Sequence, residues 1–122
     1  MKVITTITEY NDAIQQNASM LLFSLPTCKP CKTLKEWLET NYSSEINNFY
    51  YINVDTESLK EITTEIVCFP TVVLYIHSKK ISTVEGFFEY EISEQITQLK
   101  QSKLNQPTSP SVPISIKLIQ LQ

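Results

Sequence analysis

Hydrophobic and polar positions alternate along the chain with periods that predict short strands and amphipathic helices in turn. A strand over 1–4 is followed by a helix over 8–17 whose apolar residues share one face, with Thr8 expected to cap it. Residues 19–26 form an apolar run that ends at a proline, which is typical of a strand buried on both faces. The pattern therefore begins as strand, helix, buried strand.

The same periods continue to about residue 101 and predict further strands and helices. Helices are expected over about 30–42, 57–66 and 91–101. Strands are expected over 47–55, 71–77 and 81–88, with 78–80 as a hairpin turn between the last two. The order is βαβαβα followed by ββα. Because strands joined through helices run parallel and a hairpin is antiparallel, we predict an α/β fold with a central mixed β-sheet flanked by helices.

The sequence changes in character after Ser102, and we therefore divide the chain into a domain over 1–102 and a tail over 103–122. Residues 105–113 carry three prolines and predict an extended linker. Residues 114–122 alternate apolar and polar positions, as strands do. Two interpretations stay open: a flexible tail, or an added strand that docks on its own domain or on a second copy in a homodimer.

Composition narrows the class of protein. The chain has 122 residues, 42% of them hydrophobic, which suits one domain with a hydrophobic core. The formal net charge is -3 and the basic residues are scattered, so we expect no nucleic-acid partner. No apolar run is long enough to span a membrane, and the first residues lack the apolar segment of a secretory signal. We therefore expect a cytoplasmic protein without a membrane partner.

Three cysteines supply candidate chemistry: Cys28 and Cys31 lie three apart, and Cys68 is distant. An odd number does not suit a secreted scaffold held together by disulfides. A structural zinc site usually needs four ligands, and His77 is the one histidine, so we expect no metal and no cofactor beyond a redox-active Cys28–Cys31 disulfide. On spacing alone, the pair could also be two core cysteines.

The position of the pair favours chemistry, because the buried strand ends and a helix begins there. Free amide hydrogens at a helix N-terminus stabilise a thiolate, and Lys29 and Lys32 add positive charge. Pro30 suits the first helical turn because it has no N–H to leave unsatisfied. In this interpretation Cys28 attacks a substrate disulfide and Cys31 resolves the mixed disulfide.

A second feature is Pro70, which stands at the first position of a predicted strand, where a sheet tolerates proline. If the Phe69–Pro70 bond is cis, the backbone of Phe69 is free to pair with a visiting peptide.

The stretches FSLPTCKPCK, INVD, FPTVVLY and VEGFF together resemble the thioredoxin family over about residues 1–102. Cys28, Cys31, Pro70 and Gly86 match the family's Cys-x-x-Cys pair, cis proline and later glycine. The resemblance implies a thioredoxin fold and dithiol–disulfide exchange with protein substrates. It also implies that a flavoprotein reductase supplies the electrons.

Four positions depart from the family pattern. Thr27 stands where tryptophan usually precedes the first cysteine, and Lys29 replaces a glycine. The usual buried aspartate falls at Leu22, and its lysine partner falls near Tyr51. The family's acid–base relay is therefore missing, and we expect proton transfer at Cys31 to be left to water and to be slow.

The remaining candidates surround the pair. Thr27, Phe69 and Gly86 are expected to line a substrate groove, with Phe87 and Phe88 as a possible apolar rim; core packing is an equal alternative for Phe88. Lys29, Pro30 and Pro70 are expected to support the active site.

For Cys68 we prefer a small buried apolar residue, with a regulatory thiol that forms an intermolecular disulfide as the alternative.

The sequence thus predicts a thiol–disulfide oxidoreductase that reduces protein disulfides, since Pro30 in the second spacer position resembles the reducing members. The alternative is a thioredoxin-fold binding module with little redox activity.

Overall fold

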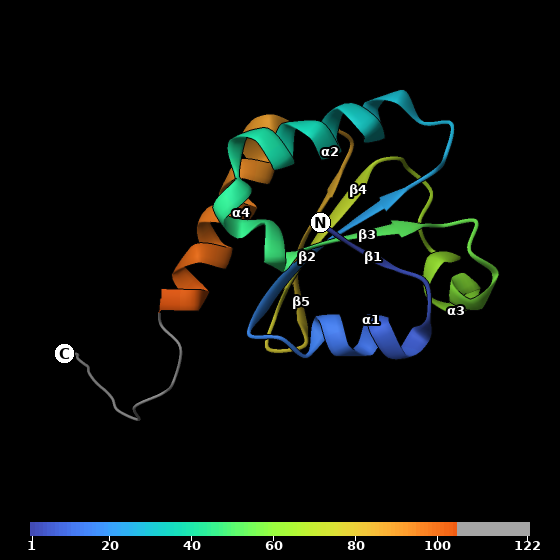
Figure 1. Ribbon diagram of the computed structural model, residues 1–122, viewed down its shortest axis with the longest axis horizontal. Coiled ribbons are helices and arrows are strands. Elements are labelled where there is room, and N and C mark those ends of the chain that lie inside the picture. Colours follow the sequence, from blue (N-terminus) through green and yellow to red (C-terminus); the bar gives the residue numbers. More distant parts are fainter. Residues whose placement is uncertain (105–122) are drawn as a thin grey trace.

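The computed structural model describes residues 1–104, and within them a five-stranded sheet carries helices on both faces (Figure 1). The strands are β1 (Lys2–Ile4), β2 (Ala18–Ser24), β3 (Phe49–Asn53), β4 (Thr71–Ile76) and β5 (Lys79–Glu85). The α-helices are α1 (Ile7–Ile14), α2 (Lys29–Asn41), α3 (Lys60–Thr63) and α4 (Glu89–Leu104). Two 3₁₀ helices, η1 (Ser43–Asn48) and η2 (Glu57–Leu59), precede β3 and α3.

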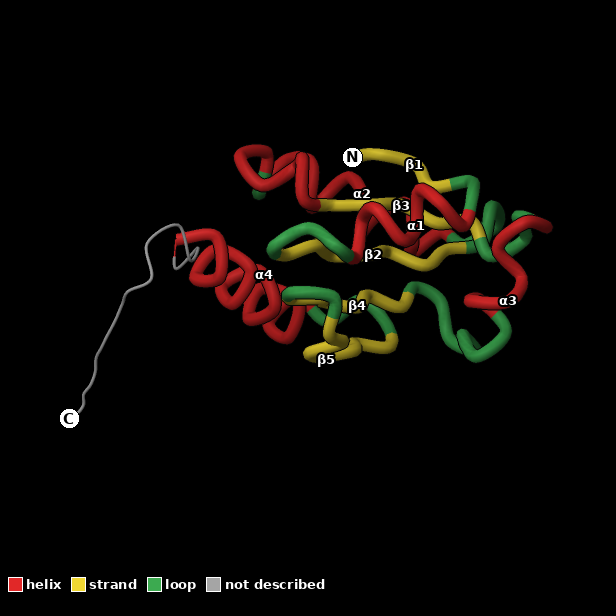
Figure 2. Tube along the Cα trace, turned by 90° about the horizontal axis from the view of Figure 1, so that it is seen from below, coloured by secondary structure: helices red, strands yellow, loops and turns green. Residues whose placement is uncertain are grey.

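The strand order across the sheet is β1-β3-β2-β4-β5, which Figure 2 shows from top to bottom. β1 and β2 both pair parallel with β3, whereas β4 runs antiparallel to β2 and to β5. The predicted mixed sheet and the order βαβαβα then ββα are confirmed.

β2 occupies the middle of the sheet, and all seven of its residues are buried. Ala18, Met20 and Leu22 belong to the core on the side of α2 and α4. Leu21 and Phe23 belong to the core on the opposite side. Because alternate side chains of a strand point to opposite faces, a strand covered on both faces needs an apolar run without a polar period. The interpretation of 19–26 as a buried strand is confirmed.

The sheet separates the two cores, and helices cover each of them. Figure 1 shows α2 and α4 on one side of the sheet and α1 and α3 on the other. The fully buried Ile92, Ile96 and Leu99 of α4 lie in the α2-side core, as their spacing predicts.

Two helix predictions need correction. The cap of α1 is Thr6 and not Thr8: its hydroxyl accepts the N–H of Glu9, whose side chain accepts from the Thr6 N–H in return. The helix predicted over 57–66 is a single turn of η2 followed by the four residues of α3. The β-branched run from Ile62 to Thr64 has low helix propensity. Among the apolar residues of the segment 57–66, only Leu59 is fully buried.

The β4–β5 turn also differs from the prediction. It consists of His77 and Ser78, both with positive φ (51° and 68°), and β5 already begins at Lys79. A two-residue hairpin turn favours positive φ because its twist matches that of the strands. Neither residue is one that signals such a turn in a sequence, and 78–80 was therefore the wrong segment.

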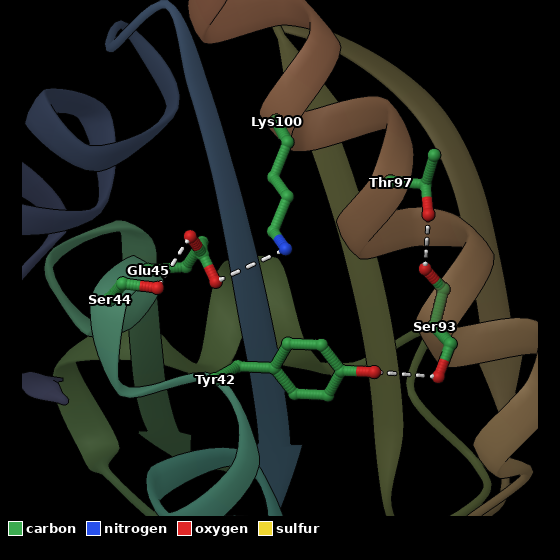
Figure 3. Close-up of polar contacts among 6 residues, drawn as sticks. All are labelled: Tyr42, Ser44, Glu45, Ser93, Thr97 and Lys100. Carbon is green, nitrogen blue, oxygen red and sulfur yellow. Dashed lines mark hydrogen bonds and ion pairs between the residues drawn. The ribbon is translucent and has the colours of Figure 1, made fainter.

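Polar contacts fasten the segment after α2 to α4 (Figure 3). The Tyr42 hydroxyl lies 3.0 Å from Ser93 Oγ. Ser44 Oγ donates to Glu45 Oε2 at 2.9 Å, and Lys100 Nζ lies 3.8 Å from Glu45 Oε1. Glu45 is only 8% exposed, and these two partners offset part of the cost of burying its carboxylate, although Oε1 accepts no hydrogen bond from the described residues.

α4 continues to Leu104, two residues beyond the domain boundary predicted at 102. The rest of the predicted tail, including its strand and its homodimer contact, lies outside the described residues. The division into domain and tail stays a prediction.

Candidate active site

Cys28 and Cys31 form a disulfide at the start of α2, with their Cα atoms 5.3 Å apart. Cys28 is the N-cap, with extended backbone (φ -85°, ψ 109°), and Cys31 is the third helical residue. Pro30 lies in the first turn, where its fixed φ is compatible with the helix and its missing N–H costs nothing. Cys28 is half-buried, whereas Cys31 is 0% exposed.

The helix N-terminus directs its amide hydrogens at the first sulfur. The Cys31 N–H donates to Cys28 Sγ at 3.2 Å, and no acidic residue lies in the first turn of α2. Helix N-termini favour negative charge because their first N–H groups have no partner within the helix. The arrangement can therefore stabilise a thiolate at Cys28 when the disulfide is reduced.

Two cations border the pair. Lys29 and Lys32 are both exposed, and in the described part of the chain neither ammonium lies within ion-pair distance of a carboxylate. Their positive charge adds to that of the helix N-terminus, although solvent screens it.

The structure brings Pro70 and Gly86 together beside the end of β2. Phe23 pairs with Thr71 and Thr71 pairs with Glu85, so the end of β2, the start of β4 and the end of β5 meet at one end of the sheet. The Phe69–Pro70 bond is cis, and the Gly86 N–H donates to the Pro70 carbonyl oxygen at 2.7 Å.

Gly86 has a φ of 110°, which L side chains rarely adopt. A Cβ there would also lie 2.7 Å from the ring of Phe88.

The aromatic residues near this end divide into two groups. Phe88 is 54% exposed, so the alternative of core packing is wrong for this residue. Phe87 is partly buried and its ring centroid lies 5.4 Å from that of Trp37. Phe69 is half-buried in the α1-side core, and Thr27 is exposed next to the disulfide.

Cys68 is free and exposed, and the preferred interpretation as a small buried residue is therefore wrong. The Thr71 hydroxyl donates to the Cys68 carbonyl oxygen at 2.7 Å, which fixes a turn just before β4. Residues 67 and 68 lie on the outside of that turn, with Val67 also exposed. Hydrophobic character alone could not identify the turn.

Comparison with known proteins agrees with this geometry. The family model described as Thioredoxin matches residues 1–98, which is most of the chain. The chain belongs to the thioredoxin family. Rabbit (Oryctolagus cuniculus) thioredoxin is 29% identical over 79 residues, covering 63% of this chain and 74% of the rabbit protein.

Solved thioredoxins share the fold. Plasmodium falciparum thioredoxin superposes with a TM-score of 0.70 at 22% identity, over 80% of this chain and 98% of that one. Mitochondrial thioredoxin 3 of Saccharomyces cerevisiae gives 0.71 at 23% identity, over 81% and 95% of the two chains. At these identities the likeness concerns the fold alone.

As a thioredoxin-family member with a Cys-x-x-Cys disulfide, the protein is a thiol–disulfide oxidoreductase that acts on protein disulfides. Thioredoxin chemistry uses no cofactor beyond this disulfide. Within residues 1–104, no three His, Cys, Asp or Glu side chains gather as a metal site would need. No helix in the same range is long and apolar enough to cross a membrane.

Sequence reasoning missed one contact beside the site of this family member. Leu22 and Tyr51, which stand at the usual aspartate and lysine positions, pair across β2 and β3. The Tyr51 hydroxyl forms a 2.8 Å hydrogen bond with Ser24 Oγ. The available signal was a serine at the end of an otherwise apolar run, since a buried polar group must find a partner.

Proposed function

We propose that this protein reduces protein disulfides, with Cys28 as the attacking thiolate and Cys31 as the resolving thiol. The observation that carries the proposal is the N-cap position of Cys28, whose sulfur receives the Cys31 N–H while the first helical turn holds no carboxylate. A thiolate is the reactive form of cysteine, and this position favours it. Lys29 supports the same charge from outside, and Pro30 supports the helix start.

The reaction consists of two exchanges. The Cys28 thiolate attacks one sulfur of the substrate disulfide, and the other substrate sulfur leaves with the electron pair and takes a proton from solvent. Cys31 then loses its proton and attacks Cys28 Sγ. The second substrate thiol is released and the Cys28–Cys31 disulfide forms, so two electrons pass from the protein to its substrate.

A groove for the substrate peptide lies along Thr27, Phe69 and Gly86, with Pro70 at its base. Three observations support this: the strand ends that carry these residues meet at one end of the sheet, Thr27 is exposed, and Gly86 adds no side chain. Phe88, more than half exposed beside Gly86, extends the apolar rim.

The electron donor in this proposal is a flavoprotein reductase. The compartment is the cytoplasm, because an odd number of cysteines does not suit a secreted scaffold held together by disulfides. We further propose that residues 105–122 mediate a homodimer. Light scattering of the full chain and of a chain ending at Leu104 tests this, because the same number of chains per particle in both proteins would exclude the tail as a dimer contact.

Insulin reduction with dithiothreitol as electron donor tests the function. The parent should precipitate insulin chains far faster than dithiothreitol alone, and Cys28→Ser should fall to that background. Cys31→Ser should trap a mixed disulfide between Cys28 and the substrate. A parent that binds a disulfide substrate without accelerating its reduction would instead be a thioredoxin-fold binding module.

The exposed Cys68 is a further thiol to test. We propose that it forms an intermolecular disulfide under oxidation, because it is free, exposed and next to Phe69. Non-reducing electrophoresis after peroxide treatment should show a covalent dimer of the parent and none of Cys68→Ser. A dimer that persists in Cys68→Ser would exclude this role.

A further inference from the structure

A pair of hydroxyl groups lies within the wall of the active site. Ser24 is fully buried at the end of β2, and its Oγ is 2.8 Å from the Tyr51 hydroxyl oxygen. Ser24 Oγ also lies 3.2 Å from the carbonyl oxygen of Leu25, to which it donates. A hydroxyl has one proton, so when Ser24 donates to Leu25 it must accept from Tyr51.

The sheet places this pair on the side of α2. Ser24 is two residues after Leu22 and therefore shares its face of β2, and Tyr51 packs against the same α2-side core. Lys35 Nζ lies 5.9 Å from the centroid of the Tyr51 ring. Lys35 follows Cys31 by four residues, which is one turn of α2, so both stand on the same row of the helix. The Tyr51 ring thus lies near Lys35, one turn of α2 after Cys31.

Cys31 needs a polar neighbour when its thiolate forms. Its side chain is 0% exposed in the disulfide form, so a negative charge on the sulfur would be poorly hydrated there. Leu22 and Leu34, both buried in the core below α2, offer no hydrogen bond. A thiolate formed next to such residues is costly unless a donor compensates it.

We propose that Tyr51, held in place by Ser24, donates a hydrogen bond to the Cys31 thiolate while the mixed disulfide is resolved. The inference rests on the proposed function, because it concerns the second of its two exchanges. It assigns the stabilisation of the Cys31 thiolate to two hydroxyl groups, because this chain has Leu22 where the family usually has a buried aspartate.

The donor role requires only that hydrogen bonds change direction. In the disulfide form Tyr51 donates to Ser24 and Ser24 donates to Leu25. When Cys31 has released its proton to solvent, the Ser24 O–H turns to the Tyr51 oxygen and the Tyr51 O–H turns to the thiolate. The thiolate then forms the S–S bond to Cys28, and the electron pair of the broken bond leaves on the substrate sulfur.

Other ionisable groups surround this part of the site and act in the parent and in the variants alike. They are Lys29, Lys32 and Lys35 of α2, Asp55 and Glu57 after β3, and Cys68 before β4. The test therefore changes one hydroxyl at a time in a common Cys68→Ser background, and the other five groups stay in place.

The two exchanges can be timed separately with 5,5′-dithiobis(2-nitrobenzoate). In the Cys68→Ser background, Cys28 attack releases the first coloured thiolate and Cys31 resolution releases the second. Tyr51→Phe should slow the second release about tenfold at neutral pH and move its pH profile upward, because a hydrogen bond to a charged sulfur is lost. The first release should not change. Ser24→Ala should give a smaller effect in the same direction.

Tyr50→Phe is the matched control. Tyr50 is the neighbouring residue of β3, but its side chain packs against the core on the opposite face of the sheet. Tyr50→Phe also removes one tyrosine hydroxyl, but its second release should be as fast as that of the background protein.

Three outcomes would overturn the inference: a second release in Tyr51→Phe that matches the background at every pH, equal slowing in Tyr50→Phe, or a first release slowed as much as the second. Failure of the proposed function has a different signature, since the background protein would then fail to accelerate insulin reduction. A first release at the rate of the background protein shows in the same trace that the α2 N-terminus of the variant is intact, and circular dichroism of each variant checks that it is folded.

Discussion

Helices α1 and α2 both start next to the end of a strand, but different groups receive their free amide hydrogens. At α1 the Thr6 hydroxyl accepts the Glu9 N–H at 3.1 Å, and the Glu9 carboxylate accepts the Thr5 N–H at 2.8 Å. At α2 the acceptor is the sulfur of Cys28, and the first turn contains no acidic residue. Oxygen atoms accept the hydrogen bonds at the start of α1, and a sulfur atom accepts the one at the start of α2.

The first helix shows what such a position does to a negative charge. Hydrogen bonds from the backbone and side chain of Thr5, and from the backbone of Thr6, hold the pKa of Glu9 below its ordinary value, although burial acts in the opposite direction. Donors that favour a carboxylate at α1 favour a thiolate at α2 for the same reason. A carboxylate in the first turn of α2 would compete for those donors, so its absence leaves them to Cys28.

Replacing Cys28 by aspartate would make the start of α2 resemble that of α1, and it has the largest expected effect. Insulin reduction should fall by about a thousandfold or more, because the attacking thiolate is gone. Helix α2 should be more stable with aspartate than with alanine at this position, since aspartate is a good N-cap and alanine is not. The unfolding free energy of Cys28→Asp should therefore exceed that of Cys28→Ala by about 1 kcal/mol, which urea unfolding of the two variants measures.

Cys28→Ala is the control for this pair, since both variants lack the thiol and the disulfide. Equal stability of the two would mean that the N-cap acceptor contributes nothing to α2.

Placing a carboxylate one residue further along should weaken the thiolate without removing it. Lys29→Glu is expected to slow iodoacetamide alkylation of Cys28 about tenfold near neutral pH, because a negative charge now competes for the helix N-terminus and a positive one is lost. The rate is measured against pH in the reduced protein with Cys68→Ser, with alkylation of Cys28 followed by mass spectrometry.

Lys29→Gln loses the positive charge without adding a negative one, so it separates the two causes. Its alkylation rate should lie between those of the parent and Lys29→Glu. If all three proteins are alkylated at the same rate over the whole pH range, charge at the first turn has no influence on Cys28.

Removing the cap of α1 should change stability and leave the chemistry untouched. Thr6→Ala deletes the hydroxyl that accepts the Glu9 N–H, and the expected cost is about 1 kcal/mol of unfolding free energy. The alkylation rate of Cys28 should equal that of the parent, since α1 lies on the opposite face of the sheet from α2 (Figure 1).

Thr8→Ala tests the competing assignment from sequence. It should alter stability by less than about 0.5 kcal/mol, as expected for an exposed position without a cap hydrogen bond. A larger cost at Thr8 than at Thr6 would contradict the cap seen in the structure.

The contrast between Thr6 and Thr8 illustrates which features a sequence reveals. The buried strand β2, the inward row of α4 and the junction before Cys28 rest on periods of several residues, and these were predicted correctly. A cap depends on the φ/ψ of one residue, and helix ends are the least regular part of a pattern. Short elements such as α3 fail for a related reason: tertiary packing decides them more than propensity does.

The site was predictable as far as its residues belong to recognisable motifs. The spacing of Cys28 and Cys31 and the glycine at 86 could be recognised as motifs. The Ser24–Tyr51 contact joins residues 27 apart, and only the pairing of β2 with β3 brings them together. Exposure of Cys68 depends on a turn fixed by the Thr71 hydroxyl, which hydrophobic character does not encode.

The smallest predicted effect concerns the charge at α1 and its dependence on pH. The pKa of Glu9 is lower in the folded protein than its ordinary value of 4.5, so the ionised form stabilises the fold. This stability is fully present above pH 4.5 and is lost as the pH falls through the lowered pKa. Urea unfolding between pH 3 and 7 should therefore show a loss on acidification in the parent, and Glu9→Gln should lack that part of it.

Asp12→Asn is the matched control, because Asp12 lies on the same helix but away from its N-terminus. Its variant should follow the pH dependence of the parent, and at neutral pH Glu9→Gln should cost less than Thr6→Ala, since glutamine can still accept the Thr5 N–H. If Glu9→Gln and the parent lose stability in parallel on acidification, a helix start in this protein does not hold a negative charge. The hydrogen bond from the Cys31 N–H to Cys28 Sγ would then have no counterpart at α1 that supports an ionised Cys28.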